Sequence, residues 1–407
     1  MRLFALVLGL LFCFGVMLDA FQTIILPRRP AGRFRITRLF YIATWRPLVL
    51  FAERLPNRKA RDQVYSIFGP ASLLLLLGLW ATLLVVGFGF VYFALGTPFV
   101  DALNEHGHWI ADLRTDIYVS GTTLFTLGLG DVTPSHHVAR ALMVVESATG
   151  LGFVALVIGY IPVLYQAFSH REVSVAMLDG RAGSPPTATE LLRRHAYEGG
   201  EVELIALLAE WERWSAEILE SHISYPLLCY YRSQHDNQSW LSAVVAVLDA
   251  CALLITTVDG AAARQAQLTF AMARHALIDL GHVFRVEKCA REKEQTGVDR
   301  LPATGFSNLC ENLSGLHLKL CGDPASMARL TAIRLLYEPH AYALADYLKM
   351  DLPLWVAEPK KTDSWKTVAG LRRGAEVEAE ALLGASEHVS DRATAAHLHD
   401  AEHGFQD

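Results

Sequence analysis

The sequence has little charge and few signals of a metal or disulfide framework. Asp, Glu, Lys and Arg make up 19% of its 407 residues, below the roughly 25% that is usual in soluble domains. Its cysteines contain no C-x-x-C pair, which argues against a zinc site. The six cysteines are Cys13, Cys229, Cys251, Cys289, Cys310 and Cys321. The low charge instead indicates a chain that buries much of its surface in a membrane or a core.

Several signals of enzymes and of known regulatory domains are also missing. Alternating strand patterns are scarce, and no glycine-rich turn follows a strand, so a nucleotide-binding or cyclic-nucleotide domain is not expected. No apolar stretch carries an arginine at every third position, as a voltage-sensing helix would. No nucleophile with a base, carboxylate pair or phosphate loop stands out, so we expect neither an enzyme nor a cofactor. The net charge of −6 argues against nucleic acid as a partner.

Apolar runs are present, and they cluster in the first 170 residues. Residues 3–26, 71–95 and 138–168 are each long enough to cross a hydrocarbon core, which needs about 20 helical residues. The first run resembles a signal peptide in part. It lacks a small-x-small cleavage pattern after Leu18 and resumes past Asp19 to Leu26, so a retained span is favoured. Asp19 is expected to pair with a buried cation or polar group.

Between the second and third runs lies the most informative segment. Thr126-Leu-Gly-Leu-Gly-Asp131 is followed by Pro134. Two glycines spaced by one residue allow successive carbonyl oxygens to point the same way, because glycine tolerates φ > 0. Four such segments around an axis would replace the water shell of a cation. This pattern predicts an ion-selectivity filter, although glycines at this spacing also allow close packing of membrane helices.

Residues 123–134, TLFTLGLGDVTP, resemble the pore loop of potassium channels, T-x-x-T-V-G-Y-G-D-x-x-P. The resemblance extends over residues 70–168. It implies that K⁺ is bound by the filter residues, and that Asp131 lies at the outer mouth. The implied filter residues are Thr126, Leu127, Gly128, Leu129 and Gly130. Leu129 replaces a tyrosine that tethers the filter in relatives, so weaker K⁺ selectivity is the alternative. One filter per chain implies a homotetramer in the lipid bilayer.

Charges in the loops predict the orientation. Residues 27–70 contain ten Lys or Arg against Glu53 and Asp62, and short basic loops remain in the cytoplasm. The loop after the second run is acidic instead. Its charged residues are Asp101, Glu105, Asp112 and Asp116 against Arg114. We therefore expect a multi-pass protein of the cell membrane with the N-terminus outside. Everything after residue 168, including five cysteines, is expected in the cytosol, where thiols stay reduced.

Residues around the filter suggest how a pore is built and gated. A short re-entrant helix is expected near residues 115–125, within a pore helix and filter at 115–131, with its negative dipole end toward the cation. Gly150 lies where relatives carry a hinge glycine, and Gly152 follows, but both glycines equally suit close helix contact. The carboxylate of Glu146 either lines the cavity or braces the pore helix through Thr122 or Thr123, and bracing is favoured.

The C-terminal half predicts a separate helical bundle at residues 169–357, after a basic linker at 27–70. The third span is expected to continue unbroken to Asp179, and Thr187 and Glu190 form a capping box. Helical patterns follow near 201–222, 240–258, 262–287, 304–320 and 324–350. Residues 240–258 suit a fourth span, but Asp249 at their centre favours a buried helix of the bundle.

A flexible tail is expected at residues 358–407. Its histidines, His388, His397, His399 and His403, suit a metal less well than a solvated tail. The sequence thus predicts an all-α membrane protein with a channel pore module, an extra N-terminal span and a helical cytoplasmic bundle. The expected function is a tetrameric potassium channel gated by the inner helix and the bundle. The alternatives are a weakly selective monovalent cation channel and a non-conducting, membrane-anchored helical sensor or scaffold.

Overall fold

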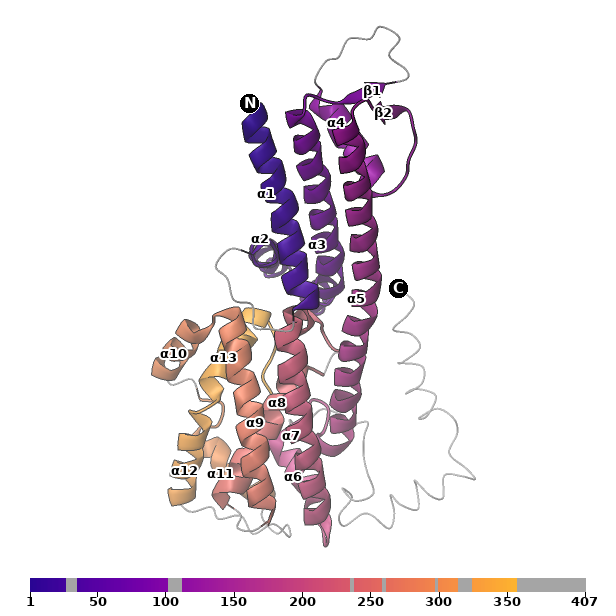
Figure 1. Cartoon of the computed structure of the whole chain (residues 1–407). Helices are drawn as coiled ribbons and strands as arrows, with labels where there is room; N and C mark the ends of the chain where they lie inside the picture. Colours follow the sequence, from indigo (N-terminus) through magenta and orange to yellow (C-terminus); the bar gives the residue numbers. More distant parts are fainter. Residues whose placement is uncertain are drawn as a thin grey trace, which may run out of the picture.

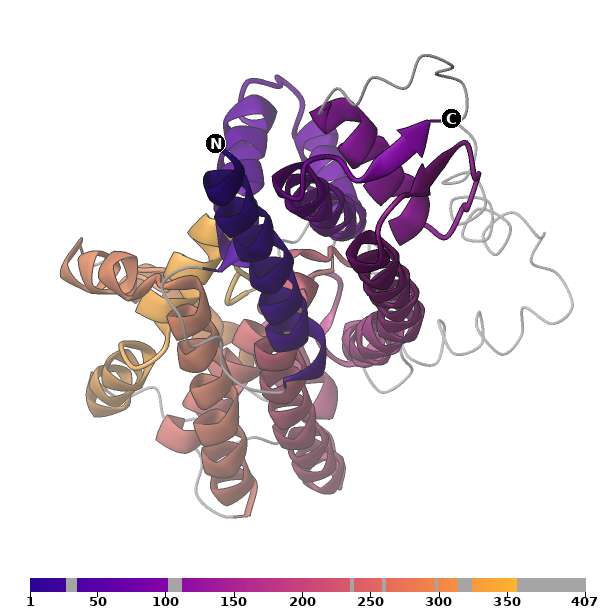
Figure 2. The same ribbon diagram turned by 45° about the horizontal axis from the view of Figure 1, so that its top comes forward.

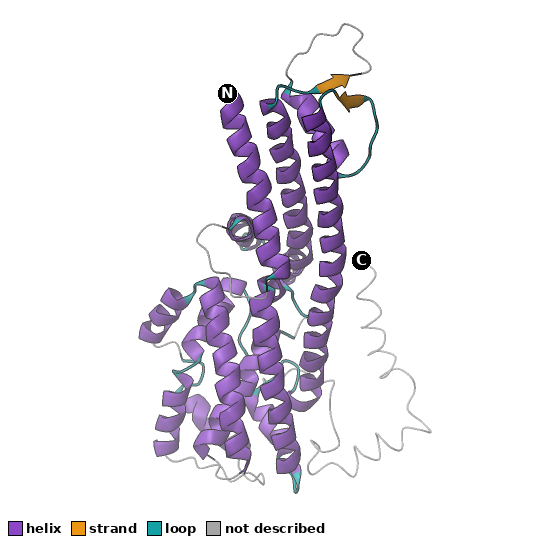
Figure 3. Cartoon of the chain, viewed as in Figure 1, coloured by secondary structure: helices purple, strands orange, loops and turns teal. Residues whose placement is uncertain are grey.

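The computed structural model describes residues 1–26, 35–101, 112–234, 238–257, 261–296, 299–313 and 324–356. The predicted tail, its histidines and Cys321 lie outside this part of the chain. The described residues form two regions stacked end to end (Figure 1). One region is a set of long helices that run side by side, and the other is a bundle of shorter helices. Within the described residues, the strands form one small two-stranded sheet, which lies at the end of the molecule remote from the bundle (Figure 3).

Three long apolar helices form the first region. They are α1 (Arg2–Ala20), which ends in a π-helical turn at Phe21–Ile25, α3 (Arg58–Ala94) and α5 (His137–Ala182). By length and composition, each could cross a membrane. Helices α1 and α3 approach closely at Gly9 and Gly87. A Cβ added to Gly9 would lie only 2.6 Å from the carbonyl oxygen of Gly87, so the crossing has no room for a side chain there. Small residues at such a crossing let membrane helices pack without a hydrophobic driving force.

A short helix with one short strand before it and one after it connects α3 to α5. Helix α4 (Leu113–Leu124) is close to the re-entrant helix expected from the sequence. Strands β1 (Phe99–Asp101) and β2 (Val132–Pro134) pair antiparallel, with Phe99 opposite Pro134. The two-stranded sheet and α4 lie at the same end of the molecule as the N-terminus (Figures 1 and 2). Because β1 precedes α4 and β2 follows the filter segment, their pairing brings the chain back to the end of the molecule at which it left β1.

The segment expected as a basic linker, residues 27–70, is largely helical where it is described. Helix α2 (Ile36–Ala52) runs across the long helices and is seen end-on in Figure 1. Helix α3 begins at Arg58 rather than near 71, and the side chain of Asn57 caps it by accepting a hydrogen bond from the Lys59 N–H at 3.0 Å. Trp45 of α2 and Phe68 of α3 belong to the same hydrophobic core as the bundle. Aromatic residues between the basic ones give this segment a face that packs.

The second region is an all-helical bundle, as the sequence predicts. Its elements are α6 (Ala188–His195), α7 (Gly200–Ser224), a 3₁₀ turn at Pro226–Tyr230, α8 (Trp240–Thr257), α9 (Ala261–Phe284), α10 (Glu287–Thr296), α11 (Ala303–Leu313), α12 (Pro324–Arg334) and α13 (Glu338–Leu348). Thr187 caps α6 by accepting a hydrogen bond from the Glu190 N–H at 3.2 Å. The lower half of α5 packs on this bundle, and α5 therefore connects the two regions.

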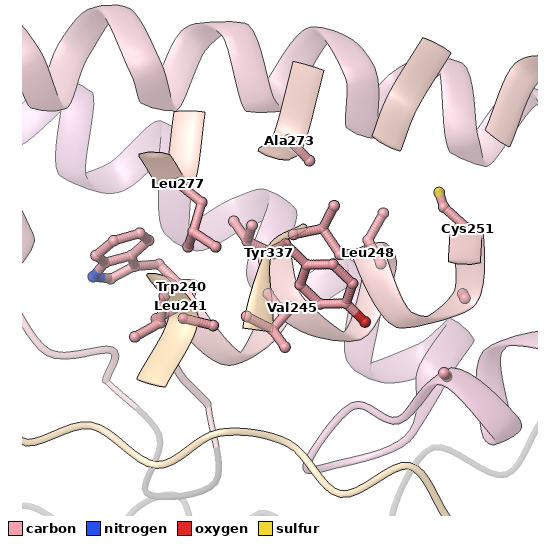
Figure 4. Close-up of a cluster of buried hydrophobic side chains, with 14 of the residues drawn as sticks. Trp240, Leu241, Val245, Leu248, Cys251, Ala273, Leu277 and Tyr337 are labelled. Carbon is pink, nitrogen blue, oxygen red and sulfur yellow. The ribbon is translucent and has the colours of Figure 1, made fainter. Parts of the chain in front are cut away.

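Helix α8 is the centre of the bundle. It is apolar enough to cross a membrane, but 94% of it is buried inside the molecule. Figure 4 shows its residues Trp240, Leu241, Val245, Leu248 and Cys251 beside Ala273 and Leu277 of α9 and Tyr337. Its one acidic residue, Asp249, is also buried. A helix enclosed in this way has no surface left for lipid, which agrees with the prediction of a buried helix rather than a span.

Candidate ion pore

The end of α4 leads directly into the predicted filter. The Thr126 N–H donates to the Thr123 carbonyl at 3.0 Å, and the Leu127 N–H donates to the Thr122 carbonyl at 2.8 Å. These bonds tie the first two filter residues to the last turn of the helix. The C-terminal end of a helix carries partial negative charge. A cation beside Thr126 would therefore lie in a favourable field.

Backbone conformation alternates along the filter. The angle φ is positive at Thr126 (55°), Gly128 (58°) and Gly130 (76°), which is every second residue of the segment. Positive φ at the two glycines is what the sequence predicts, but positive φ at Thr126 is not. A β-branched residue resists this conformation, so Thr126 is held there by its surroundings. The hydrogen bonds to the end of α4 supply that constraint.

The filter segment is uncovered in a single chain. Leu127 and Leu129 are each 62% exposed, and a Cβ placed on Gly128 or Gly130 would meet nothing within 4 Å. The described part of the chain therefore shows no close helix packing at these two glycines. Non-helical backbone at membrane depth is tolerated only where protein covers it or it lines a water-filled space. In the described part of the chain, this segment has neither the cover nor the neighbours that such backbone requires.

Asp131, at the end of the filter, is tied back to α4. The Tyr118 hydroxyl donates a hydrogen bond of 2.7 Å to its carboxylate. The sequence analysis missed this contact, although Tyr118 lies 13 residues before Asp131 on the expected pore helix. Leu129 offers no hydroxyl, so in this chain the link between filter and pore helix comes from Tyr118 instead. Strand β2 begins immediately after Asp131, and its pairing with β1 holds the returning chain.

Asp116 is one of the acidic residues that predicted the side of the membrane on which this loop lies. It falls within the helix expected near residues 115–125, and it is fully buried in the first turn of α4. Its carboxylate accepts a hydrogen bond of 2.9 Å from the Thr97 hydroxyl. Asp112, the N-cap of α4, accepts one from the Arg114 N–H at 3.0 Å. An acidic residue near a helix N-terminus is stabilised by the helix dipole, so Asp116 serves the fold of α4.

Glu146 of α5 braces the pore helix, but through partners that differ from the prediction. Its fully buried carboxylate accepts a 2.6 Å hydrogen bond from the Tyr92 hydroxyl of α3 and a short one from the Ser120 hydroxyl of α4. The expected partners, Thr122 and Thr123, were wrong, since the Thr122 hydroxyl bonds the Val119 carbonyl instead. One carboxylate therefore links α3, α4 and α5 directly behind the filter.

Gly150 and Gly152 have different surroundings. A Cβ on Gly150 would lie 1.9 Å from the Leu124 carbonyl oxygen, whereas one on Gly152 would meet nothing within 4 Å. Leu124 is the last residue of α4. Gly150 is thus the point where the backbone of α5 touches the end of the pore helix. Of the two alternatives that the sequence left open, this geometry supports close contact at Gly150.

The acidic residue in the first helix is paired, as predicted. The Asp19 carboxylate accepts hydrogen bonds from the Thr37 N–H at 2.9 Å and from the Trp80 indole at 3.1 Å, and Arg35 lies 3.5 Å away. Asp19 therefore joins the end of α1 to the start of α2 and to α3.

The described cysteines are all free, and the described residues contain no group of three His, Cys, Asp or Glu that could hold a metal.

Arg171 binds helix α5 to the bundle near the point where the helix enters it. The Arg171 guanidinium donates to the backbone carbonyls of Leu228 at 2.8 Å and Tyr231 at 2.9 Å, and it lies 3.3 Å from His222 of α7. Burial, followed by the Arg171 charge, holds the pKa of His222 well below its usual value of 6.5. The sequence analysis did not single out Arg171 as a contact, because its partners are backbone atoms far along the chain.

Comparison with known proteins agrees with this geometry. Residues 80–166 match the family model described as ion channel. An uncharacterized membrane protein of Bacillus subtilis (strain 168), YdjJ, is 28% identical over 194 residues. The alignment covers 46% of this chain and 53% of YdjJ, so the chain spans about half the length of this relative. No solved structure matches.

The family match begins at Trp80 of α3 and ends at Gln166 of α5. It therefore includes α4, the alternating backbone at Thr126–Gly130 and the Gly150 contact. The fold is that of an all-α membrane protein. The resemblance seen in the pore loop is confirmed at the level of the family model, since the residues that carry it lie within the stretch that matches an ion-channel family.

Proposed function

We propose that the protein is a tetrameric channel that conducts K⁺ through residues 126–130. The observation that carries this proposal is the positive φ at Thr126, Gly128 and Gly130. These angles occur in a segment that is exposed in one chain and fixed at the C-terminal end of α4. Alternation of this kind lets backbone oxygens face one side, where they replace the hydration shell of a cation. The ligands are the Thr126 hydroxyl and the carbonyls of residues 126–130.

Assembly into a tetramer follows from the number of filters and from the surface of α5. Each chain has one filter segment, and a ring needs four of them. Only 17% of the most apolar stretch of α5 is buried, compared with 44% for α3. Val144, Leu151 and Ile158 are each about two-thirds exposed. Neighbouring copies and the lumen would take up this surface, which makes α5 the inner helix.

The proposed orientation has the N-terminus and the filter entrance outside the cell and the bundle in the cytoplasm. The N-terminus and the β1–β2 sheet lie at one end of the molecule, and the bundle lies at the other (Figure 1). Arg35 and Arg38, at the start of α2, lie near the bundle end of the spans. Short basic segments remain in the cytoplasm, so charge and geometry support the same orientation.

Helix α5 supplies a route from the bundle to the pore. Its upper part contacts α4 at Gly150, and Arg171 in its lower part binds carbonyls that belong to the bundle. The helix is continuous between these points, with Pro162 inside it. A movement of the bundle against Arg171 would thus reach the end of the pore helix, and we propose that the bundle regulates opening in this way.

Flux through purified protein in liposomes tests the proposal. The wild type should dissipate a K⁺ gradient, and Gly128→Ala should abolish that flux, because alanine is strained at φ 58°. The matched control is Gly78→Ala on α3, where an added Cβ has open space. Assembled wild-type tetramers that conduct no cation would favour the non-conducting sensor or scaffold. A monomer or dimer as the only stable form would exclude the ring.

Selectivity is tested at Leu129. We expect K⁺ to be preferred over Na⁺, because the ligands are backbone carbonyls that any residue supplies. Leu129→Tyr adds a hydroxyl that can tether the filter, and it should shift the reversal potential further toward that of K⁺. Equal permeability of both ions before and after the change would instead assign the protein to weakly selective monovalent cation channels.

A further inference from the structure

A cavity of about 450 Å³ lies where the long helices meet the bundle. Its walls come from the end of α1, from α2, α3, α5, α9 and α13, and from the turn at Pro226–Tyr230. Leu73 and Leu76, in the part of α3 nearest the bundle, form part of it. The cavity is therefore at the level where the membrane spans end. None of its lining residues belongs to the filter.

The lining combines an apolar floor with a basic rim. Apolar contacts come from Ile42, Leu73, Leu76, Leu227, Val283 and Phe284. Four arginines also line the cavity, namely Arg35, Arg38, Arg46 and Arg285. Among the described lining residues, Asp279 is the only acidic one, and it lies 3.4 Å from His275 and 3.6 Å from His282. The cavity thus carries an excess of positive charge.

The guanidinium groups of two of these arginines have no partner among the described residues. Arg35 contacts Asp19 and donates to the Thr23 hydroxyl at 2.7 Å. Arg46 of α2 and Arg285, which follows α9, are exposed, and neither side chain has a hydrogen bond or ion pair with another described residue. Arg285 also adopts φ 56°, where glycine would cost less. The membrane region and the bundle therefore each present an uncompensated guanidinium to the same cavity.

The outer surface of α2 shows what lies beside this cavity. Leu39, Leu50 and Phe51 are 56%, 62% and 59% exposed. The helix runs across the spans at their bundle end (Figure 1). An apolar surface on a helix that lies across the spans is typical of a helix in the membrane interface. The cavity rim then lies at the depth of lipid headgroups.

We propose that this cavity binds an anionic phospholipid of the leaflet next to the bundle. Its phosphate would contact Arg46 and Arg285, because the guanidinium fork matches phosphate oxygens. The first carbons of an acyl chain would cover Ile42, Leu73 and Leu76. A bound lipid would tie α2 to α9, and so hold the bundle against the spans. Basic pockets at the ends of membrane helices bind anionic headgroups by the same physics.

Lipid binding to the full-length protein tests this directly. Native mass spectrometry would compare phosphatidylglycerol and phosphatidylcholine with identical chains, and the anionic lipid should bind at least tenfold more tightly. The double variant Arg46→Gln/Arg285→Gln should lose that affinity by on the order of 30-fold, since each arginine near a headgroup contributes a factor of about five. The matched control, Arg213→Gln/Arg264→Gln, removes two exposed arginines of α7 and α9 and should bind as the wild type does.

Three results would overturn the proposal. They are equal affinity for the two lipids, the same loss in the control variant, and binding of glycerol 3-phosphate alone as tight as that of the lipid. The last result would indicate a small soluble anion. Both double variants should melt within a few degrees of the wild type, since the exchanged arginines are exposed. No ion flux is measured, so the outcome is independent of whether the pore conducts.

Discussion

Helices α5 and α8 are both apolar enough to cross a membrane, but their surroundings are opposite. Only 17% of the apolar stretch of α5 is buried in the chain, against 94% of α8. Helix α5 leaves most of its apolar surface uncovered within the chain, whereas α8 packs its apolar surface against the other helices of the bundle. Hydrophobicity alone does not distinguish these two destinations, because both remove apolar surface from water.

Each of the two helices carries a carboxylate that is 0% exposed, and the partners differ. Glu146 of α5 is held by two neutral hydroxyls, those of Tyr92 and Ser120. Asp249 of α8 is held by the Arg300 guanidinium, at 2.9 and 2.6 Å, and by the Tyr337 hydroxyl. Asp249 is therefore part of a buried ion pair, whereas Glu146 has only hydroxyl partners among the described residues. Four experiments break or sharpen this comparison.

The largest effect is expected from removal of the carboxylate in α8. Asp249→Ala should lower the free energy of unfolding of the bundle by about 3–5 kcal/mol, because it breaks a buried ion pair and leaves the buried Tyr337 hydroxyl without its acceptor. Arg300 then retains only Glu338, at 2.8 Å, as an acidic partner. Unfolding in detergent, followed by tryptophan fluorescence, measures this. Glu210→Ala, an exposed change on α7, is the control and should be near neutral. A loss below 1 kcal/mol at Asp249 would mean that α8 is not in a packed core.

The next largest effect is expected at the contact between α5 and α4. Gly150→Ala should cost about 3 kcal/mol and abolish flux, because its methyl group would meet the Leu124 backbone oxygen, which moves only with the pore helix. Gly152→Ala lies two residues further along the same helix, in open space, and should behave as the wild type does. Thermal stability of the tetramer and flux are the measurements. If both variants conduct normally and differ only in open probability, Gly150 is a hinge rather than a contact.

A smaller effect is expected for the carboxylate of α5. Glu146→Leu leaves the buried hydroxyls of Tyr92 and Ser120 without an acceptor, and it should lower stability by about 2 kcal/mol. Glu146→Gln retains one acceptor oxygen and should recover at least half of that loss in the same melting experiment. If Glu146→Leu retained wild-type stability but altered conduction, the carboxylate would act on the ion rather than on the fold.

The smallest effect concerns the end of α5 inside the bundle. His222 is buried beside Arg171, so its pKa in the folded state lies below 6.5, and the unfolded chain binds a proton that the folded one does not. Stability should therefore be full above about pH 6.5 and should fall below it, by at most about 1.4 kcal/mol per pH unit for one proton. Melting of His222→Gln between pH 5 and 8 should show a shallower slope.

His170→Gln provides the comparison for this pH dependence. It removes an exposed histidine from α5, one residue from Arg171, and should leave the slope unchanged. Burial also lowers the pKa of His195 in α6, so a residual slope of the same sign should remain in His222→Gln. An unchanged slope in that variant would show that His222 is solvated or already paired in solution.

Residue type and local spacing determined the pore loop, the helical class and the nature of α8. Glycine at every second position permits the φ angles seen at Gly128 and Gly130 wherever the chain leads. The single acidic residue at the centre of α8 predicted its burial, since crossing a membrane with it is costly. The pairing of Asp19 followed from the same cost. These features depend on one segment and its solvent, so they can be inferred before any packing is known.

Only the tertiary structure decided which residues meet across segments. Ser120 rather than Thr122 faces Glu146, Gly150 touches Leu124, and Arg171 binds carbonyls 57 and 60 residues away. The basic segment at residues 27–70 similarly became part of the bundle core, through Trp45 of α2 and Phe68 of α3. Such contacts depend on the rotation and crossing of helices about one another. Helical periodicity shows which face of a helix is apolar, but not which partner covers it.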